Sequence, residues 1–295
     1  MKVYLNGRIL DRDEAKVSVF DRGFLFGDGV YETIRYFDGV GVMLNAHQRR
    51  LARSMNLIEI SGFDVEELGT LSERLLDANG LGDAGVYWQF TRGAEAMRSH
   101  SPQTDSMAPT VFGFAWELPS FETTRRTIVE AAAILRPDLR WLRCDIKAVG
   151  LLPNILVQME AERSGAVEAI LHRGDFISEG ASSNVCVVSN GKLVTPPLNE
   201  EATSGLILAG TTRELLFECA GMPVEVRPLS VEEFSEAREI IVASSTKLLR
   251  AVVRVDDRVI GDGTAGPVCR LLHAGMMSAI EDQIRGYESE ASGTD

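Results

Sequence analysis

The amino-acid sequence predicts an α+β protein with two domains, and three observations support that fold class. Strand and helix signals alternate over the first third of the chain, a proline and a polar stretch follow near 119–126, and the remainder is rich in short apolar strands. We therefore expect a small N-terminal α/β domain at 1–119, an interdomain linker at 120–126 and a larger strand-rich domain at 127–286. The small and acidic residues at 287–295 are expected to form a flexible tail.

Local signals justify each element of the N-terminal domain. Asn6-Gly7 and Asp38-Gly39 lie between apolar runs and are typical of tight hairpin turns. One helix is expected to start near Asn45 and to carry Arg50. A second helix shows apolar residues on one face before a stop at Asn79-Gly80: Val65, Leu68, Leu71 and Leu75. The expected strands are 3–5, 8–10, 30–37, 85–92 and 109–116.

The C-terminal domain is expected to begin with a strand at 127–135. A second strand-like run at 141–146 leads to Lys147, and a helix at 154–164 ends at Gly165. A strand at 166–171, a hairpin turning at Asn190-Gly191 and helices starting at Thr211 and Pro267 complete the domain. These signals predict a sheet interrupted by a few helices.

Composition excludes several classes of function. The net charge is −13, with 43 acidic against 30 basic residues, which argues against binding to nucleic acid or to an anionic membrane. Four cysteines lack Cys-x-x-Cys spacing and four histidines lack His-x-x-x-His spacing, so we expect neither a metal site nor a disulfide framework. The N-terminus is typical of a hairpin and not of a signal peptide, and apolar runs are too short to span a membrane. We therefore expect a cytoplasmic protein.

Lys147 and Glu179 are the most informative residues. Each is expected at the end of a strand. A lysine amine forms an imine with an aldehyde, and a carboxylate keeps a pyridine nitrogen protonated, which are the two groups that pyridoxal phosphate requires. Taken alone, the pair is weak evidence, because a lysine at the end of a strand usually lies on a solvated surface.

Four ordered segments carry a family resemblance: 21–32, 144–147, 179–184 and 210–213. Together they resemble the class IV (fold type IV) pyridoxal phosphate-dependent aminotransferases, over nearly the whole chain from Tyr4 to Ile284. The resemblance implies a fold type IV architecture with the cofactor at the domain interface. It also implies a homodimer whose sites are shared between subunits.

The resemblance also assigns the cofactor residues. Lys147 would be the catalytic Schiff-base lysine, which must act as a neutral amine, and Glu179 would contact the pyridine nitrogen. The remaining cofactor-binding residues would be Arg50, Ser183, Leu208, Thr211, Thr212, Ser244 and Ser245. A helix N-terminus at 210–212 is suited to phosphate, although a simple helix cap explains the threonines too. Likewise, Arg50 also fits a helix surface and Leu208 a core position.

The substrate side resembles the D-amino acid transaminases through the segment 91–100. In that branch an Arg-x-His pair and a tyrosine trap the substrate α-carboxylate, and the corresponding residues are Arg98, His100 and Tyr31. The resemblance implies that this loop reaches into the site of the neighbouring subunit. The loop before Arg98 is slightly longer than the family pattern, and Ala181 and Thr211 also depart from it. A merely solvated loop remains the alternative for this segment.

The predicted function is therefore a D-amino acid transaminase working by a ping-pong mechanism. It would pass an amino group from a donor such as D-alanine or D-glutamate to a 2-oxo acid such as 2-oxoglutarate or pyruvate. The alternatives are a branched-chain L-amino acid aminotransferase, an aminodeoxychorismate lyase, an (R)-amine transaminase and a non-catalytic protein of the same architecture. Thr33, Arg35 and His47 lie near the motifs and are candidates for the side-chain pocket, where Arg35 would favour acidic substrates.

Overall fold

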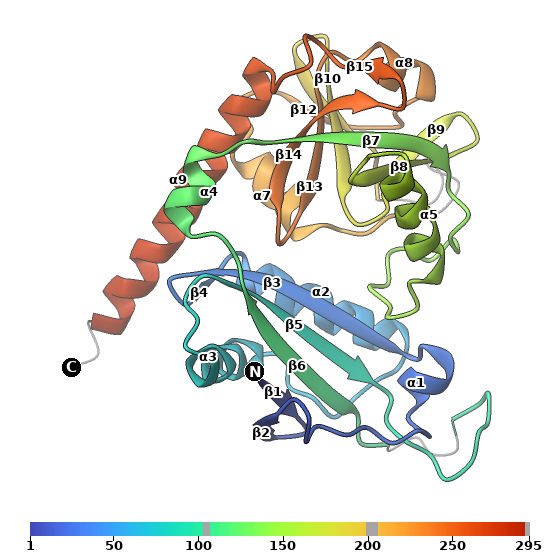
Figure 1. Cartoon of the computed structure of the whole chain (residues 1–295), viewed down its shortest axis with the longest axis vertical. Coiled ribbons are helices and arrows are strands. Elements are labelled where there is room, and N and C mark those ends of the chain that lie inside the picture. The colour runs from blue at the N-terminus through green and yellow to red at the C-terminus, as the bar shows by residue number, and fades with distance from the viewer. Residues whose placement is uncertain (103–106, 199–205, 293–295) are drawn as a thin grey trace. The chain divides into compact units, whose positions relative to one another are not determined.

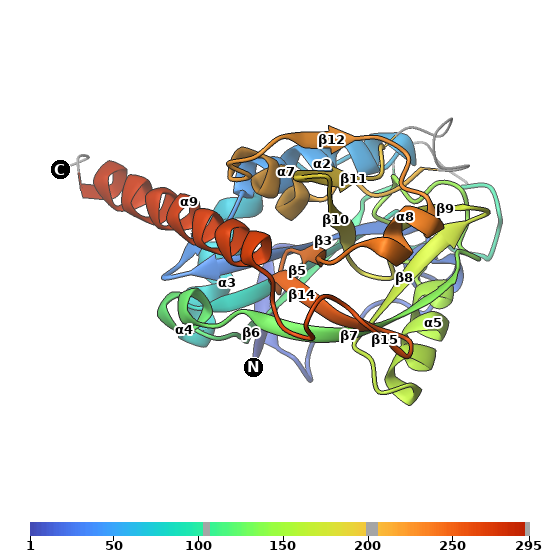
Figure 2. The same cartoon turned by 90° about the horizontal axis from the view of Figure 1, so that it is seen from above.

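The computed structural model describes residues 1–102, 107–198 and 206–292, which form two compact units. The first unit consists of Met1–Phe121 with Ile146–Gly150, and the second of Glu122–Asp145 with Leu151–Asp295. Figure 1 and Figure 2 show the elements of each unit. The sequence expectation placed residues 127–286 in the second domain. The structure instead groups Lys147 and its neighbours with the first unit.

The first unit contains a six-stranded antiparallel sheet in the order β2-β1-β6-β5-β3-β4. Its elements are β1 (Lys2–Leu5), β2 (Arg8–Asp11), α1 (Arg22–Phe26), β3 (Gly29–Phe37), β4 (Val40–Gly41), α2 (Leu44–Leu57), α3 (Glu67–Asn79), β5 (Ala84–Thr91) and β6 (Thr110–Glu117). Asn6 and Gly7 both have positive φ between β1 and β2, which confirms the predicted turn.

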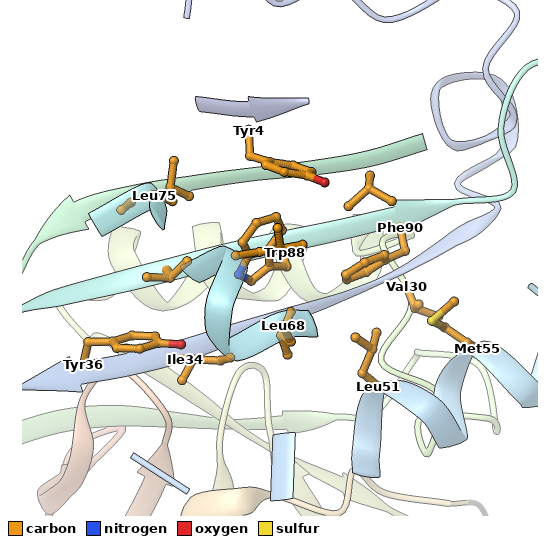
Figure 3. Packing of buried hydrophobic residues seen from close by; sticks show 14 of the residues in the cluster. Tyr4, Val30, Ile34, Tyr36, Leu51, Met55, Leu68, Leu75, Trp88 and Phe90 are labelled. Carbon is orange, nitrogen blue, oxygen red and sulfur yellow. The ribbon is translucent and has the colours of Figure 1, made fainter. Parts of the chain in front are cut away.

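Helices α2 and α3 bury one face of this sheet. Leu51 of α2 and Leu68 and Leu75 of α3 are fully buried in one apolar cluster with Trp88 of β5 (Figure 3). The indole Nε1 of Trp88 donates a hydrogen bond to Ser72 Oγ at 2.8 Å, so its polar atom is satisfied inside the core. The 3.6-residue periodicity predicted for α3 is therefore confirmed, and the opposite face of the sheet is left for other contacts.

The second unit is built on a nine-stranded mixed sheet. Its main path is β12-β11-β10-β13-β14-β7-β8-β9, and β15 pairs with β14. The strands are β7 (Val129–Pro137), β8 (Glu168–Arg173), β9 (Phe176–Gly180), β10 (Asn184–Ser189), β11 (Lys192–Thr195), β12 (Val224–Val226), β13 (Ile240–Ser244), β14 (Leu248–Val255) and β15 (Arg258–Val259). The helices are α4 (Phe121–Arg126), α5 (Leu152–Arg163), α7 (Thr211–Glu218), α8 (Val231–Glu236) and α9 (Pro267–Ser292).

Hairpin and helix signals of the second half are confirmed. Asn190 and Gly191 have φ of 50° and 72° at the turn between β10 and β11. Both residues need the left-handed region, which Asn and Gly enter at low cost. Helices α7 and α9 begin at the residues expected from the sequence. Helix α5 begins shortly before its expected start.

Three local expectations differ from the structure. The run at 141–146 is not a strand: it is an irregular turn with one isolated bridge between Arg143 and Leu206. Helix α4 occupies most of the predicted linker, and α9 continues to Ser292 through most of the predicted tail. Among the described residues, no helix combines the length and the apolar character needed to cross a membrane.

Candidate active site

Lys147 is held in the first unit by backbone contacts with β3 and α2. Its carbonyl accepts a hydrogen bond from Tyr31 N at 3.0 Å, and its own N–H donates to Ser54 Oγ at 3.3 Å. The next residue, Ala148, forms a bridge with Val30. Lys147 is therefore fixed beside the start of β3 although it is distant in sequence.

The Lys147 amine lies over an aromatic ring. Its Nζ is 4.1 Å from the ring centroid of Tyr31. Tyr31 stacks on Tyr87 of β5 at 5.6 Å, and Tyr87 contacts Phe114 of β6 at 5.2 Å. Burial raises the pKa of the Tyr87 phenol well above its ordinary value, so this ring stays neutral. The structure thus brings together two predicted site residues, Lys147 and Tyr31, and the Tyr31 ring lies on the sheet face opposite to α2 and α3.

A buried carboxylate cluster lies on the helix-covered side of β3. Glu32 is fully buried and accepts from Arg50 Nε at 2.8 Å and from Arg50 Nη2 at 2.8 Å. His47 Nδ1 lies 2.6 Å from Glu32 Oε2. Burial alone raises the pKa of Glu32, but Arg50 and His47 together hold it well below its ordinary value. Burial lowers the pKa of His47, which favours a neutral imidazole.

These contacts bear on the roles expected for three basic residues. Arg50 is a buried, paired guanidinium and not a helix-surface arginine. His47 is buried behind Glu32. Arg35 is also buried; its Nη2 donates to the carbonyl of Pro119, and its guanidinium lies 4.2 Å from the Phe37 ring centroid. Because Arg35 fastens the chain segment that leaves the first unit, its contacts argue against the expected role in binding acidic substrates.

The predicted carboxylate loop is anchored to α1. Arg22 donates to the carbonyls of Ser99 and His100 at 2.7 and 2.9 Å. The Arg98 guanidinium lies 4.7 Å from the ring centroid of Phe26, and the His100 ring lies 5.7 Å from it. The side chains of Arg98 and His100 are exposed, whereas Tyr31 is engaged with Lys147. The loop is therefore a fixed structure that presents Arg98 and His100 at the surface.

Glu179 lies in the second unit at the end of β9, as expected, and it is buried. One carboxylate oxygen accepts from Arg140 Nη1 at 2.9 Å, and the other accepts from Asn184 Nδ2 at 3.2 Å and Leu208 N at 3.1 Å. Burial raises the pKa of Glu179, and Arg140 opposes that shift. Glu179 and Leu208 are therefore in contact, and the interpretation of Glu179 as a solvated carboxylate is wrong.

The N-terminus of α7 forms a candidate anion site. Thr211 and Thr212 are its first residues, and Thr211 Oγ1 lies 3.4 Å from Ser245 Oγ in the turn that follows Ser244. Helix N-termini present unpaired N–H groups and a positive dipole end to anions. Gly210 precedes the helix, and a Cβ at this position would lie 1.9 Å from Asn184 Oδ1, so a side chain here would displace Asn184, which donates to Glu179.

Two contacts at this site were not predicted from the sequence. Arg140, with Asp138 behind it, holds Glu179. Its only sequence signal is a pair of opposite charges just after a strand. Glu168 at the start of β8 accepts from Ser183 Oγ at 2.7 Å, so the hydroxyl expected to contact the cofactor is hydrogen-bonded to a carboxylate. The assignment of Ser183 to the cofactor stays a prediction.

The donor set fits pyridoxal phosphate. The described residues supply an amine at Lys147, a buried carboxylate at Glu179, and a helix N-terminus with hydroxyl groups for a phosphate.

Comparison with known proteins leads to the same class. The family model for Amino-transferase class IV matches residues 29–255. A D-alanine aminotransferase from Staphylococcus haemolyticus is 39% identical over 286 residues, covering 96% of this chain and 99% of the relative. The structure of Escherichia coli branched-chain amino acid aminotransferase has a TM-score of 0.81 and 26% identity, covering 92% and 91% of the two chains. A PLP-bound hypothetical aminotransferase from Mycobacterium tuberculosis has a TM-score of 0.77 and 25% identity, covering 95% and 100%.

An α+β fold of type IV with a lysine and a buried carboxylate defines a transaminase that depends on pyridoxal phosphate. The chain belongs to the class IV aminotransferases. The predicted fold class, enzyme class and cofactor are thereby confirmed.

Proposed function

We propose that the protein is a D-amino acid transaminase. It would transfer the amino group of a D-amino acid, of the D-alanine or D-glutamate type, to 2-oxoglutarate or pyruvate. The observation that carries this proposal is the 39% identity to the Staphylococcus haemolyticus D-alanine aminotransferase over almost the whole of both chains. Identity to the branched-chain enzyme of Escherichia coli is only 26%.

Lys147 is proposed as the catalytic base and covalent anchor. Bound pyridoxal phosphate supplies an aldehyde for the amino group and a ring that withdraws electrons. The Lys147 amine, held over Tyr31, would take the proton from the Cα of the donor amino acid in the first half-reaction. It would return a proton to the Cα of the product amino acid in the second. The backbone contacts to Tyr31 and Ser54 fix the main chain from which this amine projects.

The other cofactor contacts are proposed from the second unit and from Arg50. Glu179 would hold a proton on the ring nitrogen, and Leu208, whose N–H orients that carboxylate, would pack on the ring. The N-terminus of α7 would bind the phosphate. The hydroxyl groups proposed to help there belong to Thr211, Thr212, Ser244 and Ser245. Arg50 would add positive charge, and its pairing with Glu32 fixes its direction. Ser183, whose hydroxyl donates to Glu168, is also proposed as a cofactor-binding residue.

The substrate carboxylate is proposed to bind Tyr31, Arg98 and His100. Because Arg22 holds the loop from behind, Arg98 and His100 project outward as a preformed pair of donors. Apolar side chains are exposed in the same unit near this loop, including Phe24 at 74% and Met97 at 72%. Exposed apolar side chains of this size favour an interface. We therefore propose a homodimer in which this loop completes the neighbouring subunit's site.

The exposed face of α5 also supports a homodimer. Apolar side chains recur there at helical spacing and remain exposed: Leu152, Ile155, Leu156 and Met159. Asn154 fastens the same helix to the second unit through the carbonyl of Ala181 at 2.7 Å. Sedimentation or light scattering of the purified protein tests the dimer, and a monomer at micromolar concentration would contradict it.

The branched-chain L-amino acid aminotransferase is the second candidate, because a solved structure with that activity matches the fold with a TM-score of 0.81. A half-reaction separates the two. Purified holoenzyme is mixed with D-alanine, D-glutamate, L-leucine or an (R)-amine without a carboxylate, and conversion of the cofactor absorbance to the pyridoxamine form is followed. Rapid conversion with D-amino acids alone is expected, whereas conversion with L-leucine alone would move the protein to the branched-chain group.

The remaining parts of the functional proposal concern location and partners. The net charge of −13 supports a protein that acts on small molecules and has no nucleic-acid or membrane partner. We propose a cytoplasmic location for the protein. Fractionation of cells that express the protein at its native level tests this location.

A further inference from the structure

We propose that Arg140, fixed by Asp138, is a positioning residue that keeps Glu179 ionised and aimed at the ring nitrogen of pyridoxal phosphate. The inference rests on the cofactor dependence of the class IV family and deepens the role proposed for Glu179. It does not depend on which amino acid is the substrate.

Glu179 needs a counter-charge because it is buried. Only 5% of its side chain is exposed. A carboxylate removed from water becomes a neutral acid unless charged or directed donors stabilise the anion. Asn184 and Leu208 supply neutral donors to one oxygen. Arg140 supplies the charge to the other oxygen, at 2.9 Å.

Arg140 is itself held in one orientation. Its Nε donates to Asp138 Oδ1 at 2.8 Å and its Nη2 donates to Asp138 Oδ2 at 2.8 Å, which is a bidentate pair. This pair turns Nη1 toward Glu179. The exposed fractions of the Arg140 and Asp138 side chains are 7% and 0%, so water has little access to the pair. The guanidinium therefore has little freedom to leave Glu179.

Asp138 is in turn fixed from two further strands. Ser178 Oγ of β9 donates to Asp138 Oδ2 at 2.9 Å, and Arg173 Nη2 of β8 lies 2.9 Å from the same oxygen. The charges therefore alternate from Glu179 through Arg140 and Asp138 to Arg173. An alternating row of buried charges is compensated at each step.

The neighbours of Glu179 shift its pKa in opposite directions. Arg140 favours the anion, whereas burial and the Asp138 charge favour the neutral acid. A carboxylate adjusted in this way remains anionic yet basic enough to share a proton with a pyridine nitrogen. Without Asp138, Arg140 would make Glu179 a weaker base. Without Arg140, Glu179 would become a neutral acid and the ring nitrogen would lose its proton.

The test reads the ring nitrogen directly. Holoenzyme is prepared with pyridoxal phosphate labelled with ¹⁵N in the ring, and the ¹⁵N chemical shift is measured without substrate. In the unsubstituted protein we expect a protonated nitrogen. Arg140→Met is expected to move the signal toward neutral pyridine, and Arg140→Lys to restore it in part. Arg136→Met is the matched control, because Arg136 is a partly exposed arginine that pairs with Glu160 and Asp256 away from Glu179.

A second variant keeps the test decisive if Arg140→Met does not fold. Asp138→Asn keeps the size of the side chain and one acceptor oxygen for Arg140 but removes the negative charge, so we expect the ¹⁵N signal to move further toward the protonated form. A merely structural role would lower thermal stability in both variants and leave the nitrogen signal of the bound cofactor unchanged. That result, or a neutral nitrogen in the unsubstituted holoenzyme, would overturn the proposal.

Turnover gives an independent measure of the same effect. Loss of one hydrogen bond between charged groups corresponds to roughly tenfold or more in kcat for Arg140→Met, with a smaller change in KM. If the unsubstituted protein transaminates L-leucine and not D-amino acids, the proposed D-amino acid specificity is wrong. The ¹⁵N experiment still tests whether Arg140 positions Glu179.

Discussion

Two buried carboxylates, Glu32 in the first unit and Glu179 in the second, are each paired with an arginine, but the two pairs are built differently. Arg50 places both Nε and Nη2 on Glu32, and His47 adds a third contact. Arg140 donates to Glu179 through Nη1 alone, because its other two nitrogens, Nε and Nη2, donate to Asp138. The pKa of Glu32 is accordingly held below its ordinary value, whereas burial leaves that of Glu179 raised.

Buried glutamates serve two purposes in this protein. Glu32 receives enough positive charge to be a permanent anion, which suits a pair that fixes Arg50 and supports β3 and α2. Glu179 shares its arginine with a competing carboxylate and so keeps some basicity, which suits a group that must hold a proton next to a ring nitrogen. The number of guanidinium nitrogens on each carboxylate, two on Glu32 and one on Glu179, therefore distinguishes the two sites.

Lys147→Ala is expected to give the largest effect. The protein should lose the visible absorbance of the covalently bound cofactor and all measurable transamination, because no other amine replaces the anchor and base. Absorbance spectra and the half-reaction measure both. Lys192→Ala, which removes a partly exposed lysine paired with Glu225, is the control and should leave both unchanged. Retained transamination by Lys147→Ala would contradict the assignment.

Glu32→Gln should reduce stability by about 3 kcal/mol, because it removes the negative charge that compensates the buried Arg50 guanidinium. Urea denaturation of the apoprotein measures the loss. Glu160→Gln removes one of the two acidic partners of Arg136 at the surface and should change stability by less than about 1 kcal/mol. Equal effects of the two substitutions would show that Glu32 is not a charge pair of the kind described.

The pH dependence of stability should separate the two carboxylates. The lowered pKa of Glu32 means that its stabilisation is present above about pH 4.5 and is lost as pH falls through its folded-state pKa. Glu179 has a raised pKa, so its contribution is present below about pH 4.5 and is lost as pH rises. In the apoprotein, Glu32→Gln should therefore flatten the loss of stability in acid.

Glu179→Gln should instead remove the loss of stability that occurs as pH rises above about 4.5. A tenfold difference in proton affinity between the folded and unfolded protein corresponds to about 1.4 kcal/mol of stability. Urea denaturation of both variants from about pH 3.5 to 7.5 measures these slopes. Identical pH profiles would contradict the contrast between the two sites.

Ser245→Ala is expected to have the smallest effect. Loss of one hydroxyl near the N-terminus of α7 should weaken binding of pyridoxal phosphate about tenfold, since a hydrogen bond to a charged group contributes about 1.5 kcal/mol or more. Equilibrium titration of apoprotein with the cofactor measures the change. Ser189→Ala, in the hairpin between β10 and β11, should bind the cofactor as the unsubstituted protein does.

Local signals in the sequence were sufficient for most elements. The apolar face of α3 and the Asn190-Gly191 turn depend on neighbouring residues only, and both are as expected. The prediction of a strand at 141–146 was wrong because the run alternates like a strand, but a strand also needs a partner along its length. The structure gives it a single bridge, from Arg143 to Leu206.

The site was predictable only as separate motifs. The pairing of Arg50 with Glu32 joins residues on different elements. The contacts of Asp138 form only when Arg173 and Ser178, on two later strands, lie beside it. No periodicity or propensity reports such contacts, because they depend on strand order. The grouping of Lys147 with the first unit was missed for the same reason.

That grouping has a consequence for synthesis of the chain on the ribosome. The first unit takes its last segment, Ile146–Gly150, from beyond Phe121, and this segment contributes Ile146 to the apolar core that contains Val30 and Leu51. Domains that fold during translation usually complete themselves in order from the N-terminus. Here the N-terminal unit stays incomplete until residue 150 has emerged, so a fragment that stops at Phe121 lacks both part of its core and Lys147.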